Sequence, residues 1–450
     1  MGAGLAAALA LPPPAGLSPS GKAALAVMAA SVALWTSEAL PTGATALVAI
    51  TLLALTGAAR DFPAALSGFA RPTVFFLLGV LALGVAALES GLAARAAAAL
   101  LAAARGRSGR LYGQMVASFA LLALLLPSAS TRGAILLPVY EQALDLLRAP
   151  PGGPLRRAIM LGLASLNRLG SNALLTGGVT PVVAAALMGG FTWTSWLVYM
   201  GVPVYTLLLF GGMLVFLLTR PDRDVLAESD WKLPREPLSP RERRALIITA
   251  AVSALWMTDA LHHWDPAIPA LIGAIAVVTP GLGVVTWRDL ERTLGWANLL
   301  VIAASLSLGQ AMISSGAAGW LADWLRVGAG PLVGHPFGLA AALVLACLAL
   351  RAVLANISAY LTLLIPVVME LAPDLGLNPL VCAMLVTVAG DSVLYFPAQS
   401  SSSLIVAERG HLSAGPVVGL ALLMAALVLL VLLFLALPYW AWLGQPFATV

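Results

Sequence analysis

Charged side chains are scarce in this chain of 450 residues. Asp, Glu, Lys and Arg together make up 10% of it, whereas soluble domains carry about 25%. So few polar side chains cannot cover a surface that faces water, which excludes a soluble globular protein. The chain instead has many apolar runs long enough to cross the ~30 Å hydrocarbon layer, and its mean hydropathy is +0.96. We therefore predict an all-α polytopic membrane protein.

Cysteine and histidine are almost absent. Cys347 and Cys382 both lie in apolar runs and do not form a disulfide framework. The four histidines lie near the ends of predicted spans, without the clustering that a metal site requires. No nucleophile–base constellation is evident either. We expect no metal, no cofactor and no enzymatic activity.

The basic residues are concentrated in a few loops. The sequence pI is about 9.3, which on its own could indicate a nucleic-acid partner. Segments 95–110, 148–157 and 220–244 are rich in arginine, however, and an excess of Lys and Arg marks cytoplasmic loops. We predict a multi-pass protein of the inner (cytoplasmic) membrane, with the bilayer around it and no nucleic-acid partner. Segment 317–334 contains only Arg326 and is expected outside.

The chain repeats itself. Leu34-Trp35-Thr36-Ser37-Glu38-Ala39-Leu40 returns as Leu255-Trp256-Met257-Thr258-Asp259-Ala260-Leu261, and Leu136-Leu137-Pro138-Val139 returns as Leu364-Ile365-Pro366-Val367. A repeat of this length in an apolar chain is typical of transporters built from two related halves, with the substrate site at their interface. The loop at 95–110 is rich in arginine, whereas the matching loop at 317–334 has one arginine. The two loops are therefore expected on opposite sides of the membrane, which means that the second half is inverted.

These features divide the chain into four segments. We predict a short N-terminal segment over 1–22, which could be the remnant of a helix, and a first transmembrane repeat over 23–219. A cytoplasmic linker over 220–244 follows, with both charges and prolines. The second repeat, over 245–450, completes the chain.

Each half contains a pair of apolar stretches that are too short to cross a membrane alone. Small polar residues separate the two members of each pair. We predict a re-entrant hairpin from each pair, because non-helical tips are tolerated at depth only when buried in protein or facing a wet cavity. The pairs are 112–126 with 133–147, around Ser128–Thr131, and 337–354 with 361–372, around Asn356–Ala359.

A broken transmembrane helix is predicted after each hairpin. Residues 165–181 and 390–403 place Gly, Pro and hydroxyl side chains inside apolar spans. An unwound helix leaves backbone amides and carbonyls for a ligand or an ion to satisfy. A packing kink is the alternative, but two interruptions at matched positions favour a site.

Three arginines lie near these features, namely Arg132, Arg168 and Arg351. A charge at bilayer depth costs at least ~2.5–3.5 kcal/mol unless it is paired or solvated. Ion pairs with Asp391, Glu141 or Glu408, or snorkelling to a surface, would satisfy them. Alternatively they form an anion site, since guanidinium groups bind carboxylate, sulfate or phosphate through two parallel hydrogen bonds.

The stretch Leu34–Pro41 resembles the Trp-x-Thr-Glu-Ala-Ile/Leu-Pro signature of the divalent anion/sodium symporter family, which belongs to the larger ion transporter superfamily. Phe76–Gly79, Glu89–Ala93 and the run from Leu255 to Gly316 also resemble it. The resemblance covers nearly the whole chain. It implies a carrier of small di- or tricarboxylates or sulfate, built as an inverted repeat with two hairpins. It also implies a homodimer and elevator-type alternating access.

The hairpin tips and broken helices are the expected binding site. Ser128, Ser130, Thr131, Asn356 and Ser358 stand at helix starts, where free amides attract anions, although such residues also cap helices. The substrate-binding residues that we expect are Ser128, Ser130, Thr131, Arg132, Asn356, Ser358, Thr176, Gly177, Pro397, Ser400 and Ser401. The resemblance implies sodium as coupling ion, and its expected ligands are Ser128, Gly170, Asn172, Asn356, Gly390 and Ser392.

The tips depart from the family's Ser-Asn-Thr pattern. Ser128-Ala129-Ser130 and Asn356-Ile357-Ser358 both lack its middle Asn, and Ser400–Ser403 replaces a Thr-Pro-Pro-Asn loop. Pro127–Gly133 resembles the Pro-Ser-Asn-Thr-Ala-Arg-Gly stretch of dicarboxylate exchangers in the family, which places Arg132 on the arginine. A fixed guanidinium can replace a sodium ion, which favours an exchanger. Sodium-coupled symport of dicarboxylate or sulfate, and a cation/proton antiporter of the same superfamily, remain alternatives.

Overall fold

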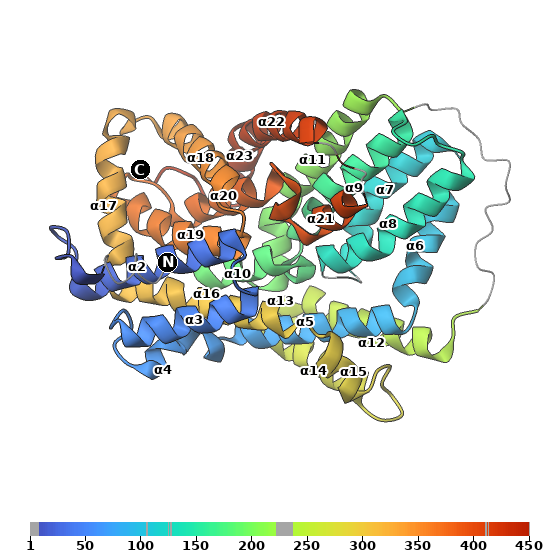
Figure 1. Ribbon diagram of the computed structural model, residues 1–450, viewed down its shortest axis with the longest axis horizontal. Coiled ribbons are helices and arrows are strands. Elements are labelled where there is room, and N and C mark those ends of the chain that lie inside the picture. Colours follow the sequence, from blue (N-terminus) through green and yellow to red (C-terminus); the bar gives the residue numbers. More distant parts are fainter. Residues whose placement is uncertain are drawn as a thin grey trace.

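The protein is described by a computed structural model that covers residues 9–104, 107–124, 126, 128–221, 237–409, 412 and 414–449. The described residues are helical apart from turns, short connections and one isolated β-bridge between Leu377 and Ala448. In Figure 1 several long helices lie along the longest axis of the molecule, α17 (Ala317–Ala329) stands across this axis at the left end, and α6–α9 (residues 92–172) lie at the right end.

The helices of the first half alternate with short loops. They are α2 (Pro19–Ser37), α3 (Thr42–Leu55), α4 (Phe62–Ala65), α5 (Pro72–Glu89), α6 (Leu92–Ala103), α7 (Ser108–Ala123), α8 (Ala129–Leu146), α9 (Pro154–Asn172), α10 (Val179–Met188) and α11 (Trp193–Thr219). Two 3₁₀ turns, η1 (Ser67–Ala70) and η2 (Leu175–Gly177), lie between them.

The second half contains the same kinds of element. Its helices are α12 (Pro240–Met257), α13 (Asp259–His262), α14 (Ala267–Val278), α15 (Trp287–Thr293), α16 (Trp296–Ser314), α17 (Ala317–Ala329), α18 (Pro336–Val353), α19 (Ile357–Asp374), α20 (Pro379–Ser392), α21 (Ser401–Glu408), α22 (Ala414–Val431) and α23 (Leu437–Trp442). The short elements are η3 (Gly330–Leu332), η4 (Pro397–Gln399) and the π-helical turn η5 (Leu432–Ala436).

Six helices of the described residues are long and apolar enough to span a membrane: α5, α11, α16, α18, α19 and the continuous α22–α23. They support the prediction of a polytopic membrane protein. Both α18 and α19 are 18 residues long, so the expectation that this pair is too short to cross was wrong. The apolar run 361–372 is extended by Ile357–Tyr360, because Asn356 caps the helix that far upstream.

Of the three predicted segment boundaries, 219/220 coincides with the end of α11, and the other two fall inside helices. Ser18 caps α2, whose first residue is Pro19, so the division at 22/23 lies in its first turn. Ser239 and Glu242 form a capping box for α12, and this helix therefore begins within the segment predicted as linker. Residues 1–8 and 222–236 lie outside the described part of the chain.

The repeated tryptophan motif has the same structural role in each half. The indole of Trp35 donates a hydrogen bond to the carbonyl of Thr42 at the start of α3 (3.2 Å). The indole of Trp256 donates to the carbonyl of Pro266, directly before α14 (3.0 Å). Each motif thus fixes the turn between two antiparallel helices, which explains why it occurs twice.

The expected order of hairpin and broken helix is present in both halves. Helices α7 and α8 precede α9, which ends at Asn172 and resumes as α10 after η2. Helices α18 and α19 precede α20, which ends at Ser392 and resumes as α21 after η4. The two predicted interruptions are therefore confirmed. In Figure 1 the pair α7–α8 and the pair α18–α19 lie at opposite ends of the molecule.

The two halves exchange contacts at the breaks. Helix α21 of the second half packs against α8 and α9, and helix α10 of the first half packs against α19 and α20. The middle of the molecule is therefore built from both halves.

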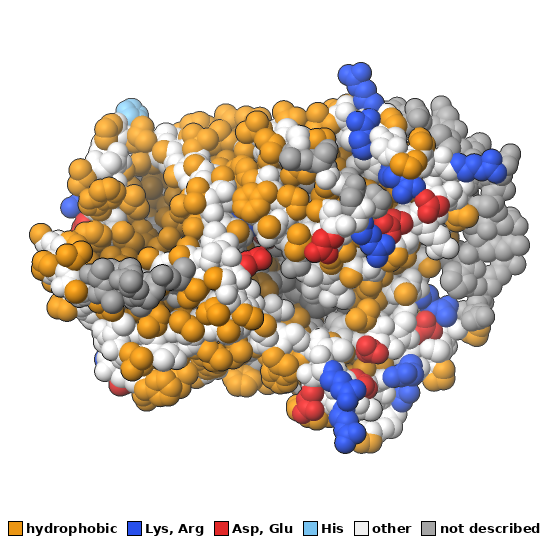
Figure 2. All heavy atoms as spheres, viewed as in Figure 1, with side chains coloured by type: hydrophobic (Ala, Val, Ile, Leu, Met, Phe, Trp, Pro, Cys, Tyr) orange, Lys and Arg blue, Asp and Glu red, His pale blue; other side chains and the backbone are white. Residues whose placement is uncertain are grey.

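Charged side chains gather at one end of the molecule. Figure 2 shows a mostly apolar surface, with Lys, Arg, Asp and Glu concentrated toward the right, where Figure 1 places α6–α9 and α15. A broad apolar surface with charges at its end is typical of a protein surrounded by lipid.

The arginine-rich end is predicted to face the cytoplasm. Arg107 and Gly328 are both exposed, at the start of α7 and on α17, whereas Cys347 and Cys382 are buried and should give little background labelling. In intact cells we expect an impermeant maleimide to label Gly328→Cys, and to label Arg107→Cys only after permeabilisation. Rapid labelling of Arg107→Cys from outside would contradict this topology.

Candidate functional site

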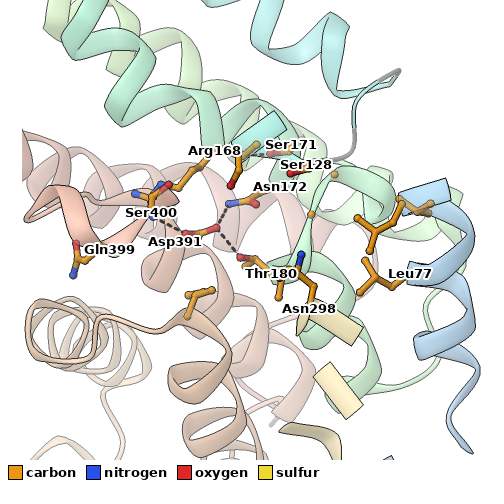
Figure 3. A pocket seen from close by; sticks show the side chains of 18 residues that line it. Leu77, Ser128, Arg168, Ser171, Asn172, Thr180, Asn298, Asp391, Gln399 and Ser400 are labelled. Carbon is orange, nitrogen blue, oxygen red and sulfur yellow. Dashed lines mark hydrogen bonds and ion pairs between the residues drawn. The ribbon is translucent and has the colours of Figure 1, made fainter. Parts of the chain in front are cut away.

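A cavity of about 220 Å³ lies where the broken helices of the two halves meet. Its wall is mixed, with apolar side chains on one side and polar groups on the other (Figure 3). The lining residues are Leu77, Val80, Leu81, Ser128, Ala129, Ser130, Arg168, Ser171, Asn172, Gly177, Gly178, Val179, Thr180, Asn298, Ile357, Asp391, Gln399 and Ser400.

Four helices begin at this cavity. Helix α8 starts after its cap Ser128, α10 after Gly178, α19 after Asn356 and α21 after Ser400. The first amides of a helix lack intrahelical partners and carry about half a positive charge. Four converging helix starts make the cavity attractive to an anion.

Asp391, in the last turn of α20, is the centre of a polar network. Its carboxylate accepts hydrogen bonds from Arg168 Nη1 (2.8 Å), Asn172 Nδ2 (2.8 Å) and Thr180 Oγ1 (2.7 Å). Figure 3 shows the three donors converging on it. The network joins α9 and α10 of the first half to α20 of the second half, so the ion-pair alternative considered for Arg168 is confirmed.

Arg168 has more hydrogen-bonding capacity than this pair uses. Its side chain and that of Asp391 are each 7% exposed. Nε and Nη2 of Arg168 have no hydrogen-bond partner within the described residues and are shielded from solvent. A buried charged donor without an acceptor is costly. A ligand carboxylate that displaces a neighbour could accept from both nitrogens at once.

Arg132 does not line the cavity. It is completely buried on α8, and its donors bind neutral oxygens of the first hairpin tip and the first broken helix. They reach the carbonyls of Leu126 (2.7 Å) and Asn167 (2.9 Å), Asn167 Oδ1 (3.0 Å) and Ser171 Oγ (2.8 Å). These bonds fix the tip against the end of α9, and Ser171 itself reaches the cavity.

Arg351 has a similar structural role in the second half, although it precedes the tip, whereas Arg132 follows its tip. It is completely buried at the end of α18. Its Nε donates to the carbonyl of Gly390 at the end of α20 (2.8 Å), and its Nη1 donates to the carbonyls of Leu354 and Ala355 at the tip. In each half, therefore, an arginine joins a hairpin tip to the broken helix beside it.

The structure brings only some of the expected residues to the cavity. Those that line it are Ser128, Ser130, Gly177, Asn172 and Ser400. Those outside the lining set are Thr131, Arg132, Thr176, Asn356, Ser358, Pro397, Gly170, Gly390 and Ser392. Ser401 is the first residue of α21.

Three of the expected glycines are required for close packing. A Cβ on Gly170 would lie 2.5 Å from the backbone of Phe119 in α7, and one on Gly390 would lie 2.2 Å from the ring of Tyr360. A Cβ on Gly177 would lie 1.7 Å from the carbonyl oxygen of Ser171, so this position admits only glycine. These contacts hold the breaks tightly against the hairpins and shape the cavity wall.

From the sequence, Asp391 was considered as a partner for an arginine and as one of the few acids inside predicted spans, but not as a binding residue. Thr180, Asn298 and Gln399 were not identified. Asp391 carried a usable signal, since it is an acid inside a predicted break. Gln399 donates to the carbonyl of Arg351 (2.8 Å) and accepts from the amide of Tyr395 (2.8 Å). Its role follows from these tertiary contacts, which no local sequence pattern shows.

The family model described as the sodium:sulfate symporter transmembrane region matches residues 3–445. The L-tartrate/succinate antiporter of Escherichia coli (strain K12) is 24% identical over 383 residues, which cover 79% of this chain and 75% of that protein. A putative malate transporter of Bacillus subtilis (strain 168), YflS, is 25% identical over 332 residues, 70% of this chain and 69% of the relative. Among solved structures, the YdaH transporter of Alcanivorax borkumensis has a similar fold, with a TM-score of 0.54, 18% identity and coverage of 85% and 87% of the two chains.

The position of Arg132 leads to a stability prediction. Arg132→Met leaves buried carbonyl oxygens without donors, at about 1–3 kcal/mol each, so we expect the free energy of unfolding to fall by about 3 kcal/mol or more. The melting temperature of the purified protein without ligand should drop. Arg157→Met, which replaces an exposed arginine on the neighbouring helix α9, is the matched control. If the variant has a normal melting temperature that no longer rises when succinate is added, Arg132 would instead be part of the anion site.

Proposed function

The chain belongs to the sodium:sulfate symporter transmembrane region family and is a membrane transporter, not an enzyme, and we propose that it is a secondary-active carrier of small dicarboxylates. The cavity between the broken helices is the proposed binding site. Relatives described as L-tartrate/succinate and malate transporters support this substrate class.

The observation that carries the proposal is the balance of buried charge around the cavity. The buried ionic side chains at the hairpin tips and breaks are Arg132, Arg168, Arg351 and Asp391. Three positive charges against one negative charge leave a net charge of +2, which a dianion would neutralise. Because opposite charges attract strongly in a medium of low dielectric constant, a dicarboxylate is a better complement than a cation or a neutral solute.

The polar contacts support a carboxylate ligand. Nε and Nη2 of Arg168 are suited to two parallel hydrogen bonds with one carboxylate. The starts of α8 and α19, which also reach the cavity, offer backbone amides for a second carboxylate. Among the described lining residues Asp391 is the one acid, and its oxygens already accept three hydrogen bonds. A cation/proton antiporter therefore receives little support.

We propose that the carrier depends less on sodium than a symporter with the usual tips. Arg132 and Arg351 place permanent positive charge against the tip and helix-end carbonyls in both halves. A sodium ion would use oxygen ligands of this kind. Since a fixed charge cannot dissociate, the empty carrier retains surplus positive charge, which disfavours its return and favours exchange. Sodium-coupled symport of dicarboxylate or sulfate remains the second candidate.

The transport cycle that we propose is of the elevator type. The hairpins and broken helices would move as one body against the remaining helices. A separate hydrophobic cluster formed mainly by α2, α3, α16 and α17 supports such a division. The inverted relation of the halves, a homodimer and insertion in the inner membrane are parts of the same proposal.

A substitution of Arg168 tests the proposed substrate site directly. Arg168→Lys keeps the charge beside Asp391 but removes the planar pair of donors. Since hydrogen bonds to charged groups contribute about 1.5–3 kcal/mol each, we expect succinate affinity to fall by roughly thirtyfold or more. Titration calorimetry would measure it, with Arg157→Lys as the control. Unchanged affinity in Arg168→Lys would place the binding site elsewhere.

Coupling can be tested in proteoliposomes. Flux of labelled succinate into vesicles preloaded with unlabelled succinate should proceed without a sodium gradient, because the site's positive charge is supplied by arginine. Empty vesicles should take up much less. Uptake that requires sodium and shows no stimulation by internal substrate would support the symport alternative instead.

A further inference from the structure

We propose that Asp391 is a specificity-determining residue that sets the charge of the accepted anion, so that dianions bind better than trianions such as citrate. This inference rests on the proposed function, because it assumes that the cavity is the anion site. It goes further because it explains why a dicarboxylate would bind better than a tricarboxylate. The arginines near the cavity would not by themselves make this distinction.

The carboxylate of Asp391 is a fixed part of the cavity wall. Arg168 and Asn172 hold it from α9, and Thr180 holds it from α10. An ionised carboxylate only accepts hydrogen bonds, and all three neighbours donate. The side chain is therefore held in place by three donors at the wall of the cavity, which brings its negative charge close to an anion that enters.

The charged groups around Asp391 come from several elements. Arg168 of α9 is in direct contact with it. Arg351 of α18 binds the carbonyl of the adjacent residue, Gly390. Arg132 of α8 is linked through Ser171, which lines the same cavity. Asp391 thus reduces three positive charges to a net charge of +2, the complement of a dianion.

A third carboxylate would change this balance. It would add a negative charge near Asp391 without a further positive partner. Repulsion between two unit charges a few ångströms apart in a partly buried site weakens binding by roughly tenfold or more. A neutral residue at position 391 removes this repulsion. It should strengthen the binding of every anion, and that of a trianion most, because the effect scales with ligand charge.

The test compares the citrate-to-succinate affinity ratio in variants of the full-length purified protein. Dissociation constants would be measured by calorimetry at about pH 8, where the carboxyl groups of both probes are ionised. We expect Asp391→Asn and Asp391→Ser to raise the ratio by about tenfold. Asp391→Glu keeps the charge, and Asp145→Asn removes an acid whose side chain is 70% exposed on α8; both should leave the ratio within about twofold of the wild type.

Two neutral variants are included because Asn places an amide opposite the amide of Asn172, whereas Ser does not. The melting temperature of each variant would confirm that it is folded. A wild-type protein that prefers citrate, or folded neutral variants with an unchanged ratio, would overturn the inference while leaving anion transport intact. If neither probe, nor tartrate, malate or sulfate, binds the wild type, the proposed function fails and the inference fails with it.

Discussion

The structure depends on stabilising four ionic side chains in the interior of the protein. Arg132, Arg168, Arg351 and Asp391 lie at the interruptions of α9 and α20, where helix ends expose carbonyls that need donors. The arginines supply these donors, and the broken helices supply the acceptors that make buried guanidinium groups tolerable. Each feature would be unstable without the other. The interruptions, the hairpin tips and the charges therefore form one unit.

Within this unit the arginines have two different functions. Arg132 and Arg351 bind carbonyls of a tip and a helix end, so most of their hydrogen bonds are used for structure while their charge remains; Nη2 of Arg351 has no partner among the described residues. Arg168 binds an acid and retains two donors without partners in the described structure. Arg132 and Arg351 thus contribute positive charge to the site from a distance, whereas Arg168 can contact the anion directly.

Much of the architecture could be predicted from the sequence. Apolar runs located the spanning helices, and glycine, proline and hydroxyl residues located both breaks, because helix interruption is a local property of the chain. The site was predicted less completely. Ser128, Ser130 and Asn172 line the cavity, but Arg132 does not, because the sequence motif in which it stands does not specify the direction of its side chain. The contacts of Asp391 join residues more than 200 positions apart, and no pattern along the chain specifies them.

The exchange of helices between the halves has a consequence for biosynthesis. Helix α21 completes the packing of α8 and α9, and α10 packs against α19 and α20. When the ribosome has delivered only the first half, Arg132 can already join its tip to α9, but Arg168 lacks Asp391. The charge of Arg168 must then wait in the membrane for the last third of the chain. The ion pair between the two halves can therefore form only after residue 391 has been synthesised.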